Sequence, residues 1–196
     1  MNLPNKLTVS RFVLTGAFLA VMFSNMPARE TVALALFSMA SLTDYFDGAI
    51  ARREKLVTNF GILMDPLADK ILVCSTFIAF VGLGWIEAWM VVIIVARELA
   101  ITGLRLLAAS KNLVLAAEGY GKHKTISQII AIIALLVLHS YQAWGGVGQV
   151  LFGWGFRGHS WAEYFTPLAV WVSVALTFLS GVVYLWRNRQ LYLQDL

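Results

Sequence analysis

Six segments of about twenty mostly apolar residues fill most of this chain, and each is long enough to cross a lipid bilayer as a helix. They lie at residues 7–23, 31–53, 60–81, 85–109, 124–141 and 165–186. Hydrophobic residues make up 59% of the 196 positions and charged residues 13%, against about 45–50% and roughly 25% in soluble proteins. The sequence therefore predicts an all-α, polytopic membrane protein, with a single domain over residues 1–196 and six transmembrane helices.

Positive charge is distributed unevenly between the two sides of this layout. Six spans put both termini on one side, which carries ten of the fifteen Lys and Arg residues, and the opposite loops carry only Arg29 and Arg157. The ten are Lys6, Arg11, Arg52, Arg53, Lys55, Lys111, Lys122, Lys124, Arg187 and Arg189. Because cytoplasmic loops are enriched in Lys and Arg, both termini are predicted to be cytoplasmic. The net charge of +4 then reflects topology, anionic lipids and phosphate substrates, with no nucleic-acid partner.

Four of the eleven acidic residues, Asp44, Asp47, Asp65 and Asp69, fall inside the second and third spans. Ionisable residues within membrane segments are costly and usually functional, and clustered carboxylates need a counter-charge. A short polar connection, residues 53–59, joins the two spans. Folding this hairpin about residues 56 and 57 places Asp44 and Asp69 at similar depths in the membrane. It does the same for Asp47 and Asp65. The spacings i,i+3 and i,i+4 also keep each pair on one helical face. The four carboxylates are therefore predicted to meet below the cytoplasmic surface.

This set of ligands indicates a metal site. Carboxylate oxygens suit a hard divalent cation, Mg²⁺ or Mn²⁺, and no Cys/His cluster that would favour Zn²⁺ is nearby in sequence. Asp44 and Asp47 lie toward the C-terminal end of their span, where the helix dipole disfavours negative charge, so that pair especially needs cations. Small residues accompany the acids and would let a backbone or a flat ligand approach closely. They are Gly48, Ala49, Ala51 and Gly61.

Together these residues resemble, without a departure, the signature of the CDP-alcohol phosphotransferase family, D-x-x-D-G-x-x-A-R-x8-G-x3-D-x3-D. Nine fixed positions at fixed spacing make the match specific, and the six-span layout extends it over nearly the whole chain. Members of this family move a substituted phosphate from a CDP-linked lipid to an alcohol and release CMP. The resemblance implies two divalent ions in the membrane.

The resemblance also implies roles for individual residues. Asp44, Asp47 and Asp65 would be metal ligands, and Asp69 would be the general base and a further ligand. The residues implied to bind the CDP-lipid are Asn5, Thr8, Gly48, Ala51, Arg52 and Gly61. Of these, Gly48 and Ala51 would line the cytidine site and Arg52 would contact a nucleotide phosphate. Asn5 and Thr8, in a shorter and weaker match, would lie near the diphosphate.

A second polar cluster lies on the fourth and fifth spans: Arg97, Glu98, Arg105, Lys122, Lys124 and Thr125. Arg97 and Arg105 share a helical face, whereas Glu98, next to Arg97 in sequence, lies on another. A basic pocket opposite the metals favours an acceptor that itself carries a phosphate. The alternatives are an ordinary topological charge for Lys122 and Lys124 and a structural ion pair for Arg97 and Arg105. Lys70 would either pair with a metal-site carboxylate or extend to the membrane surface.

The strings 97–105 and 121–125 resemble bacterial members of the family that use CDP-diacylglycerol as donor and sn-glycerol 3-phosphate as acceptor. The acceptor phosphate would be held by Arg97, Arg105, Lys122, Lys124 and Thr125, in a protein of the bacterial inner membrane. One alternative is a family member with a different acceptor. That acceptor would be the one that gives cardiolipin, or an inositol phosphate, or serine. The other alternative is a divalent-cation transporter, which would spread its acids through the membrane depth.

Three further expectations concern the rest of the chain. The aromatic segment 144–164 is predicted to be an outward-facing interfacial loop. Cys74, the single cysteine, excludes an intramolecular disulfide and is expected to be a small buried residue. Helix faces rich in small residues are compatible with a homodimer.

Overall fold

The computed structural model describes residues 3–54, 59–111, 113, 120–156 and 158–193. For residues 3–8, 44–54, 59–63, 65–66, 69, 120–122, 156 and 193 it describes the backbone alone. Six long helices account for most of the described residues, and they agree with the six predicted segments to within a few residues at most ends. They are α1 (Leu3–Met22), α2 (Arg29–Glu54), α3 (Asn59–Gly82), α4 (Ala88–Ser110), α5 (Tyr120–Ser140) and α7 (Trp161–Arg187). The predicted all-α class is confirmed.

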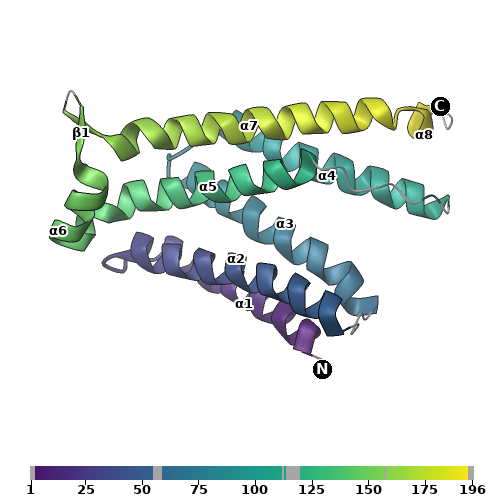
Figure 1. Cartoon of the computed structure of the whole chain (residues 1–196), viewed down its shortest axis with the longest axis horizontal. Coiled ribbons are helices and arrows are strands. Elements are labelled where there is room, and N and C mark those ends of the chain that lie inside the picture. Colours follow the sequence, from purple (N-terminus) through teal and green to yellow (C-terminus); the bar gives the residue numbers. More distant parts are fainter. Residues whose placement is uncertain (1–2, 55–58, 112, 114–119, 157, 194–196) are drawn as a thin grey trace.

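The long helices form two groups whose axes are inclined to each other (Figure 1). Helices α4, α5 and α7 lie along one side, α1 and α2 lie along the other, and α3 crosses between them. The closest packing joins α1 to α2 and α5 to α7, and α3 contacts α1, α4 and α5. Both described chain ends lie at the same end of the molecule, where α2 also ends and α3 begins. The last turns of α2 and the first turns of α3, which carry the four aspartates, lie toward that end.

The core consists of apolar side chains from all six long helices. Phe18 of α1 packs against Phe37 of α2 with ring centroids 6.1 Å apart. Small residues at other contacts, including Ala33 and Ala131, are fully buried and let helices approach closely. Large apolar side chains also cover the outer surface, with Leu99 68% exposed and Val13 65% exposed. Such a surface is typical of helices that face lipid rather than water.

Among the described residues, two helical stretches are long and apolar enough to cross a membrane, His123–Gly153 and Trp161–Arg187. Two shorter stretches, Val9–Met22 and Lys70–Gly82, are also apolar. These findings agree with a membrane protein. The count of six spans and the side on which the termini lie stay predictions.

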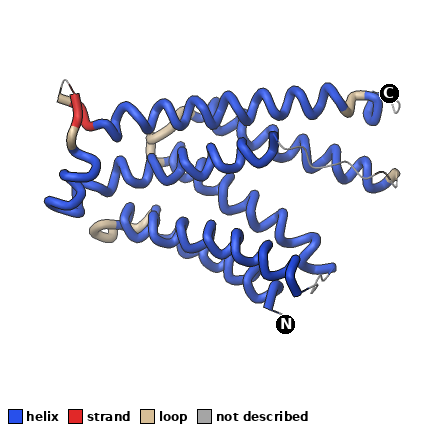
Figure 2. The backbone as a smooth tube through the Cα atoms, in the orientation of Figure 1, coloured by secondary structure: helices blue, strands red, loops and turns tan. Residues whose placement is uncertain are grey.

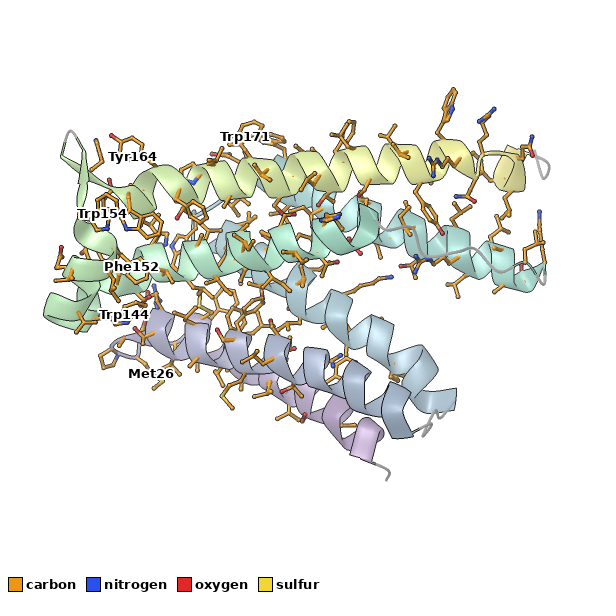
Figure 3. All side chains as sticks on the ribbon, in the orientation of Figure 1. Met26, Trp144, Phe152, Trp154, Tyr164 and Trp171 are labelled. Carbon is orange, nitrogen blue, oxygen red and sulfur yellow. The ribbon has the colours of Figure 1, made fainter. Side chains whose placement is uncertain are left out.

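The aromatic segment between α5 and α7 folds into short elements at the end of the molecule opposite the chain termini (Figure 2). They are η1 (Tyr141–Trp144), α6 (Gly145–Gly148), η2 (Gln149–Gly153), and the antiparallel pair β1 (Gly155–Phe156) and β2 (His159–Ser160). Figure 3 shows Trp144, Phe152, Trp154 and Tyr164 gathered there with Met26. The Trp144 indole N–H donates to Thr31 Oγ1 at 2.9 Å, which ties the segment to the start of α2.

The start of α7 is fixed by a reciprocal cap. The Ser160 hydroxyl oxygen accepts from the Glu163 backbone N–H at 3.3 Å, and the same hydroxyl lies 3.3 Å from the Glu163 carboxylate. The Glu163 carboxylate also lies 2.6 Å from the His159 Nδ1. Farther along α7, Gly181 and Tyr184 lie against the predicted acceptor residues Arg97 and Arg105, and Thr177 contacts Gln128. A short last helix, α8 (Gln190–Leu193), ends the described chain.

Candidate active site

The four aspartates lie on the two helices that the sequence predicts, near the connection between them. Asp44 precedes the end of α2 by ten residues and Asp69 follows the start of α3 by ten, while Asp47 and Asp65 are seven and six residues away. At 1.5 Å per residue, Asp44 and Asp69 each lie about 15 Å along their helices from the connection, and Asp47 and Asp65 each lie about 10 Å from it. The helix boundaries are thus symmetric about the predicted midpoint at residues 56 and 57. The four side chains lie outside the described residues, so their role as metal ligands stays a prediction.

The composition of this set fits hard divalent ions. It offers carboxylate oxygens from two helices, which are the ligands that Mg²⁺ and Mn²⁺ prefer. The residues predicted to bind the CDP-lipid also lie on this part of the fold. Asn5 and Thr8 lie in the first turns of α1, Gly48, Ala51 and Arg52 lie in α2, and Gly61 lies in α3. Their side-chain positions are outside the described residues. Because α1 packs against both α2 and α3, the three segments belong to one region.

A pocket of about 180 Å³ lies where α3, α4 and α5 meet. We call it the basic pocket. It is lined by Lys70, Val73 and Cys74 of α3, Glu98 and Arg105 of α4, and Lys124, Thr125 and Gln128 of α5. Three of the predicted acceptor residues, Arg105, Lys124 and Thr125, are therefore brought together. The side chain of Lys122 is not described, and its backbone lies in the first turn of α5.

The basic pocket contains a buried network around Glu98. Lys124 and Glu98 are 5% and 6% exposed, and the Lys124 ammonium donates to Glu98 Oε1. The Arg97 Nη1 donates to the same oxygen at 3.3 Å. Adjacent helical residues point about 100° apart, yet the long Arg97 side chain bends round the helix to reach its neighbour. The sequence signal for Glu98 was available, since it is the only acidic residue of α4.

Lys70 connects the basic pocket to the predicted metal site along the chain. It follows Asp69 directly, and its ammonium donates to Thr102 Oγ1 of α4. Thr102 Oγ1 in turn donates to the Glu98 backbone carbonyl at 2.7 Å. The sequence left two orientations open for Lys70, toward a metal-site carboxylate or toward the membrane surface. The contact with Thr102 is a different one, because it reaches across to the neighbouring helix. The basic pocket thus begins one residue beyond Asp69.

Contacts with α7 support the far side of the pocket. The Arg105 Nε donates to the Tyr184 hydroxyl at 3.4 Å, and its guanidinium carbon lies 5.8 Å from the centre of that ring. The Gln128 amide donates to Thr177 Oγ1 at 3.2 Å. Cys74, expected to be a small buried residue, is only partly buried and lines the pocket. Sequence reasoning missed these supports because they depend on which helices become neighbours.

Arg97 is held between α4 and α7 by a close approach to Gly181. A Cβ atom built on Gly181 would lie 2.7 Å from Arg97 Cγ, which is closer than real Cβ contacts. The hydrogen of Arg97 Nε is buried and has no hydrogen-bond partner among the described residues. Arg97 does not line the basic pocket, and reaches it through Glu98. Gly181 is therefore the residue that makes room for the Arg97 stem.

We expect Gly181→Ala to destabilise the protein although alanine is the better helix former. Alanine at an unobstructed helical site would gain about 0.5–1 kcal/mol, but crowding of this kind costs roughly 1–3 kcal/mol. The apparent Tm in detergent should fall by a few degrees, since about 1 kcal/mol shifts Tm by about 2–4 °C at this size. Gly103→Ala is the matched control, because its Cβ would meet nothing within 4 Å. An equal or higher Tm for Gly181→Ala than for Gly103→Ala would contradict the clash.

Comparison with known proteins places the chain in a family. The family model described as CDP-alcohol phosphatidyltransferase matches residues 1–186. The chain therefore belongs to the CDP-alcohol phosphatidyltransferase family, as its aspartate signature predicts. Divalent metal ions are the general cofactor of this family, which agrees with the predicted class of metal.

Individual relatives carry names that are more specific than that of the family. The chain is 40% identical over 199 residues to the CDP-diacylglycerol–glycerol-3-phosphate 3-phosphatidyltransferase of Bacillus subtilis, covering 95% of each chain. It is 31% identical to the protein of the same name from Cereibacter sphaeroides, over 99% of this chain and 98% of the relative. A probable phosphatidylglycerophosphate synthase of Mycobacterium tuberculosis is 41% identical over 134 residues, which are 67% of this chain and 64% of that protein.

Proposed function

We propose that this chain transfers the phosphatidyl group of CDP-diacylglycerol to sn-glycerol 3-phosphate, giving phosphatidylglycerophosphate and CMP. The names of the full-length relatives agree with this reaction, which the sequence also predicts. The observation that carries the choice of acceptor is the basic pocket. Lys70, Arg105 and Lys124 line it with one carboxylate, that of Glu98, among the described side chains. Such an excess of positive charge, next to the helix of Asp69, suits an alcohol that carries a phosphate.

In the proposed mechanism the two groups of residues have separate tasks. Asp44, Asp47, Asp65 and Asp69 hold Mg²⁺ or Mn²⁺, two ions by analogy with the family. When bound, such ions clamp a diphosphate and neutralise charge on the attacking and leaving oxygens. Asp69 accepts the proton of the acceptor's primary hydroxyl. That oxygen forms a bond to the lipid-side phosphorus, the bond to the bridging oxygen breaks, and CMP leaves with the bond's electron pair.

The remaining residues bind and orient the two substrates. Gly48 and Ala51 would leave room for the cytidine, and Arg52, Asn5, Thr8 and Gly61 would border the CDP-lipid. Arg105, Lys122, Lys124 and Thr125 would hold the acceptor phosphate, and Arg97 would support them through Glu98. Orientation of this kind brings the hydroxyl within reach of Asp69 and removes part of the entropic barrier.

We further infer a six-span arrangement in the bacterial inner membrane with both termini cytoplasmic. The two long apolar stretches, the lipid-type outer surface and the excess of Lys and Arg on one side support this topology. Both described chain ends lie toward the end of the molecule where α2 ends and α3 begins, which are the parts of these helices that carry the aspartates (Figure 1). The donor lipid would then enter from the bilayer and the acceptor from the cytoplasm.

An acceptor panel tests the proposal. Purified protein is given CDP-diacylglycerol with sn-glycerol 3-phosphate, inositol 1-phosphate, serine or phosphatidylglycerol, and CMP release is measured. We expect turnover with sn-glycerol 3-phosphate in Mg²⁺ or Mn²⁺, loss of turnover in EDTA, and recovery when the metal is restored. Strong turnover with serine and none with sn-glycerol 3-phosphate would overturn the choice of acceptor. Metal flux into proteoliposomes without CDP-lipid, and no CMP release, would instead favour a transporter.

A further inference from the structure

Glu98 occupies an unusual position, because it is an acid at the centre of a predicted anion site. It is the only carboxylate among the described side chains that line the basic pocket. A carboxylate near a bound phosphate would repel it, so Glu98 is a poor choice of direct ligand. Its partners show another role. One oxygen of Glu98 receives hydrogen bonds from Arg97 of its own helix and from Lys124 of α5.

The energetics of this network depend on burial. An ammonium or guanidinium group that leaves water without a counter-charge loses several kcal/mol of solvation. Glu98 supplies that counter-charge while the pocket holds no anion. An ammonium also has three donors, and Glu98 uses one, which leaves Lys124 able to bind a second anion. Both side chains are therefore held in place by Glu98 before any ligand arrives.

The network also fixes how α4 and α5 sit relative to each other. Glu98 lies on α4 and Lys124 on the first turns of α5, and Thr102 links the Glu98 backbone carbonyl to Lys70 of α3. Cations from three helices are thus tied to one stretch of α4, residues 98–102. A binding site gains affinity when its groups are already positioned, since less ordering is needed on binding.

We propose that Glu98 is a positioning residue for the acceptor: paired with Arg97 on its own helix, it holds Lys124 in place for the phosphate of the acceptor without touching that phosphate. The inference rests on the proposed function, because it concerns the same acceptor site. It assigns to one buried acid the control of acceptor binding, and it leaves donor binding to the aspartate region. A purely structural ion pair would instead affect stability and leave the two KM values in their original ratio.

The kinetic test uses Glu98→Gln, which keeps the shape of the side chain and removes its charge. We expect the KM for sn-glycerol 3-phosphate to rise at least tenfold, with the KM for CDP-diacylglycerol changed less than twofold. Glu163→Gln, the same substitution on an acid at the opposite end of the molecule, should change neither value. An unchanged acceptor KM in Glu98→Gln, or an equal rise in both KM values, would overturn the proposal.

A double-mutant cycle tests whether Glu98 acts through Lys124. In a Lys124→Ala background, Glu98→Gln should raise the acceptor KM by less than about threefold, because the residue it positions is already gone. The same multiplicative effect in both backgrounds would contradict action through Lys124. If Glu98→Gln does not fold, Glu98→Asp supplies the test, since it keeps the charge with a shorter reach. That variant should raise the acceptor KM without changing the donor KM, and equal changes in both would overturn the proposal.

The single cysteine of the chain gives a readout that does not depend on turnover. Cys74 lines the basic pocket, so modification by methyl methanethiosulfonate, followed by mass spectrometry, reports whether the pocket is occupied. Sn-glycerol 3-phosphate or inorganic phosphate should slow this modification in the wild type. The protective concentration should rise at least tenfold in Glu98→Gln and stay the same in Glu163→Gln. Equal protection of Glu98→Gln and the wild type would overturn the role of Glu98.

These measurements distinguish failure of the proposed function from failure of the positioning role of Glu98. A wild type that releases no CMP with sn-glycerol 3-phosphate would refute the proposed function. A wild type that turns over this acceptor, but whose Cys74 is never protected by it, would refute the basic pocket as the acceptor site and Glu98 with it. Protection in the wild type with an unchanged acceptor KM in Glu98→Gln would refute the positioning role alone.

Discussion

Asp69→Asn is expected to reduce CMP release by at least about a thousandfold while leaving CDP-diacylglycerol binding largely intact. The amide cannot accept the proton of the acceptor hydroxyl, and a positioned general base contributes about 10²–10⁴-fold to such a reaction. Asparagine also weakens one metal ligand, which adds to the loss. Three carboxylates, Asp44, Asp47 and Asp65, would remain to hold the metal against the donor. Turnover is measured as CMP release at saturating concentrations of both substrates.

The control for this variant comes from the same chain. Asp195 is the one aspartate outside the signature, and Asp195→Asn makes the same chemical change elsewhere. It should keep wild-type turnover. Binding of CDP-diacylglycerol in the presence of Mn²⁺, followed by calorimetry, shows whether Asp69→Asn retains the donor site. Wild-type turnover in Asp69→Asn would remove this residue from the mechanism, and loss of both binding and turnover would make it mainly a ligand.

The spacing of the aspartates was the part of the site most open to prediction. Two helices joined by a short connection leave one simple way to fold back, so position along the chain determines depth in the membrane. The helix boundaries of α2 and α3 have the mirror arrangement that this argument predicts. Apolar length likewise predicts the long helices, because a span of about twenty residues has few alternatives in lipid.

The contacts between helices were less open to prediction. A helical repeat gives the direction in which a side chain leaves the backbone, but not how far a long side chain bends. Arg97 therefore pairs with Glu98 although the two leave the helix in different directions. The approach of Gly181 to Arg97 depends on α7 lying against α4, and no pattern within either segment specifies that neighbour. The arrangement of the aromatic segment also depends on a contact between distant parts of the chain, since the Trp144 indole N–H donates to Thr31 of α2.

Lys124→Ala is expected to raise the KM for sn-glycerol 3-phosphate about tenfold to a hundredfold and to change the KM for CDP-diacylglycerol far less. A hydrogen bond to a charged group contributes about 1.5–3 kcal/mol, and each 1.4 kcal/mol corresponds to about tenfold in affinity. Lys124 is buried and lines the basic pocket, so a ligand in that pocket meets its ammonium directly. Lys124→Arg should show a smaller rise, because it keeps the charge with a different shape.

A lysine outside the basic pocket provides the comparison. Lys111 follows the end of α4 on the same predicted side of the membrane, and its ammonium donates to the Leu191 carbonyl at 3.2 Å. Lys111→Ala removes one positive charge from that side and should leave both KM values near those of the wild type. If Lys124→Ala and Lys111→Ala behave alike, Lys124 contributes general positive charge. If only Lys124→Ala loses the acceptor, position in the basic pocket rather than charge alone determines binding.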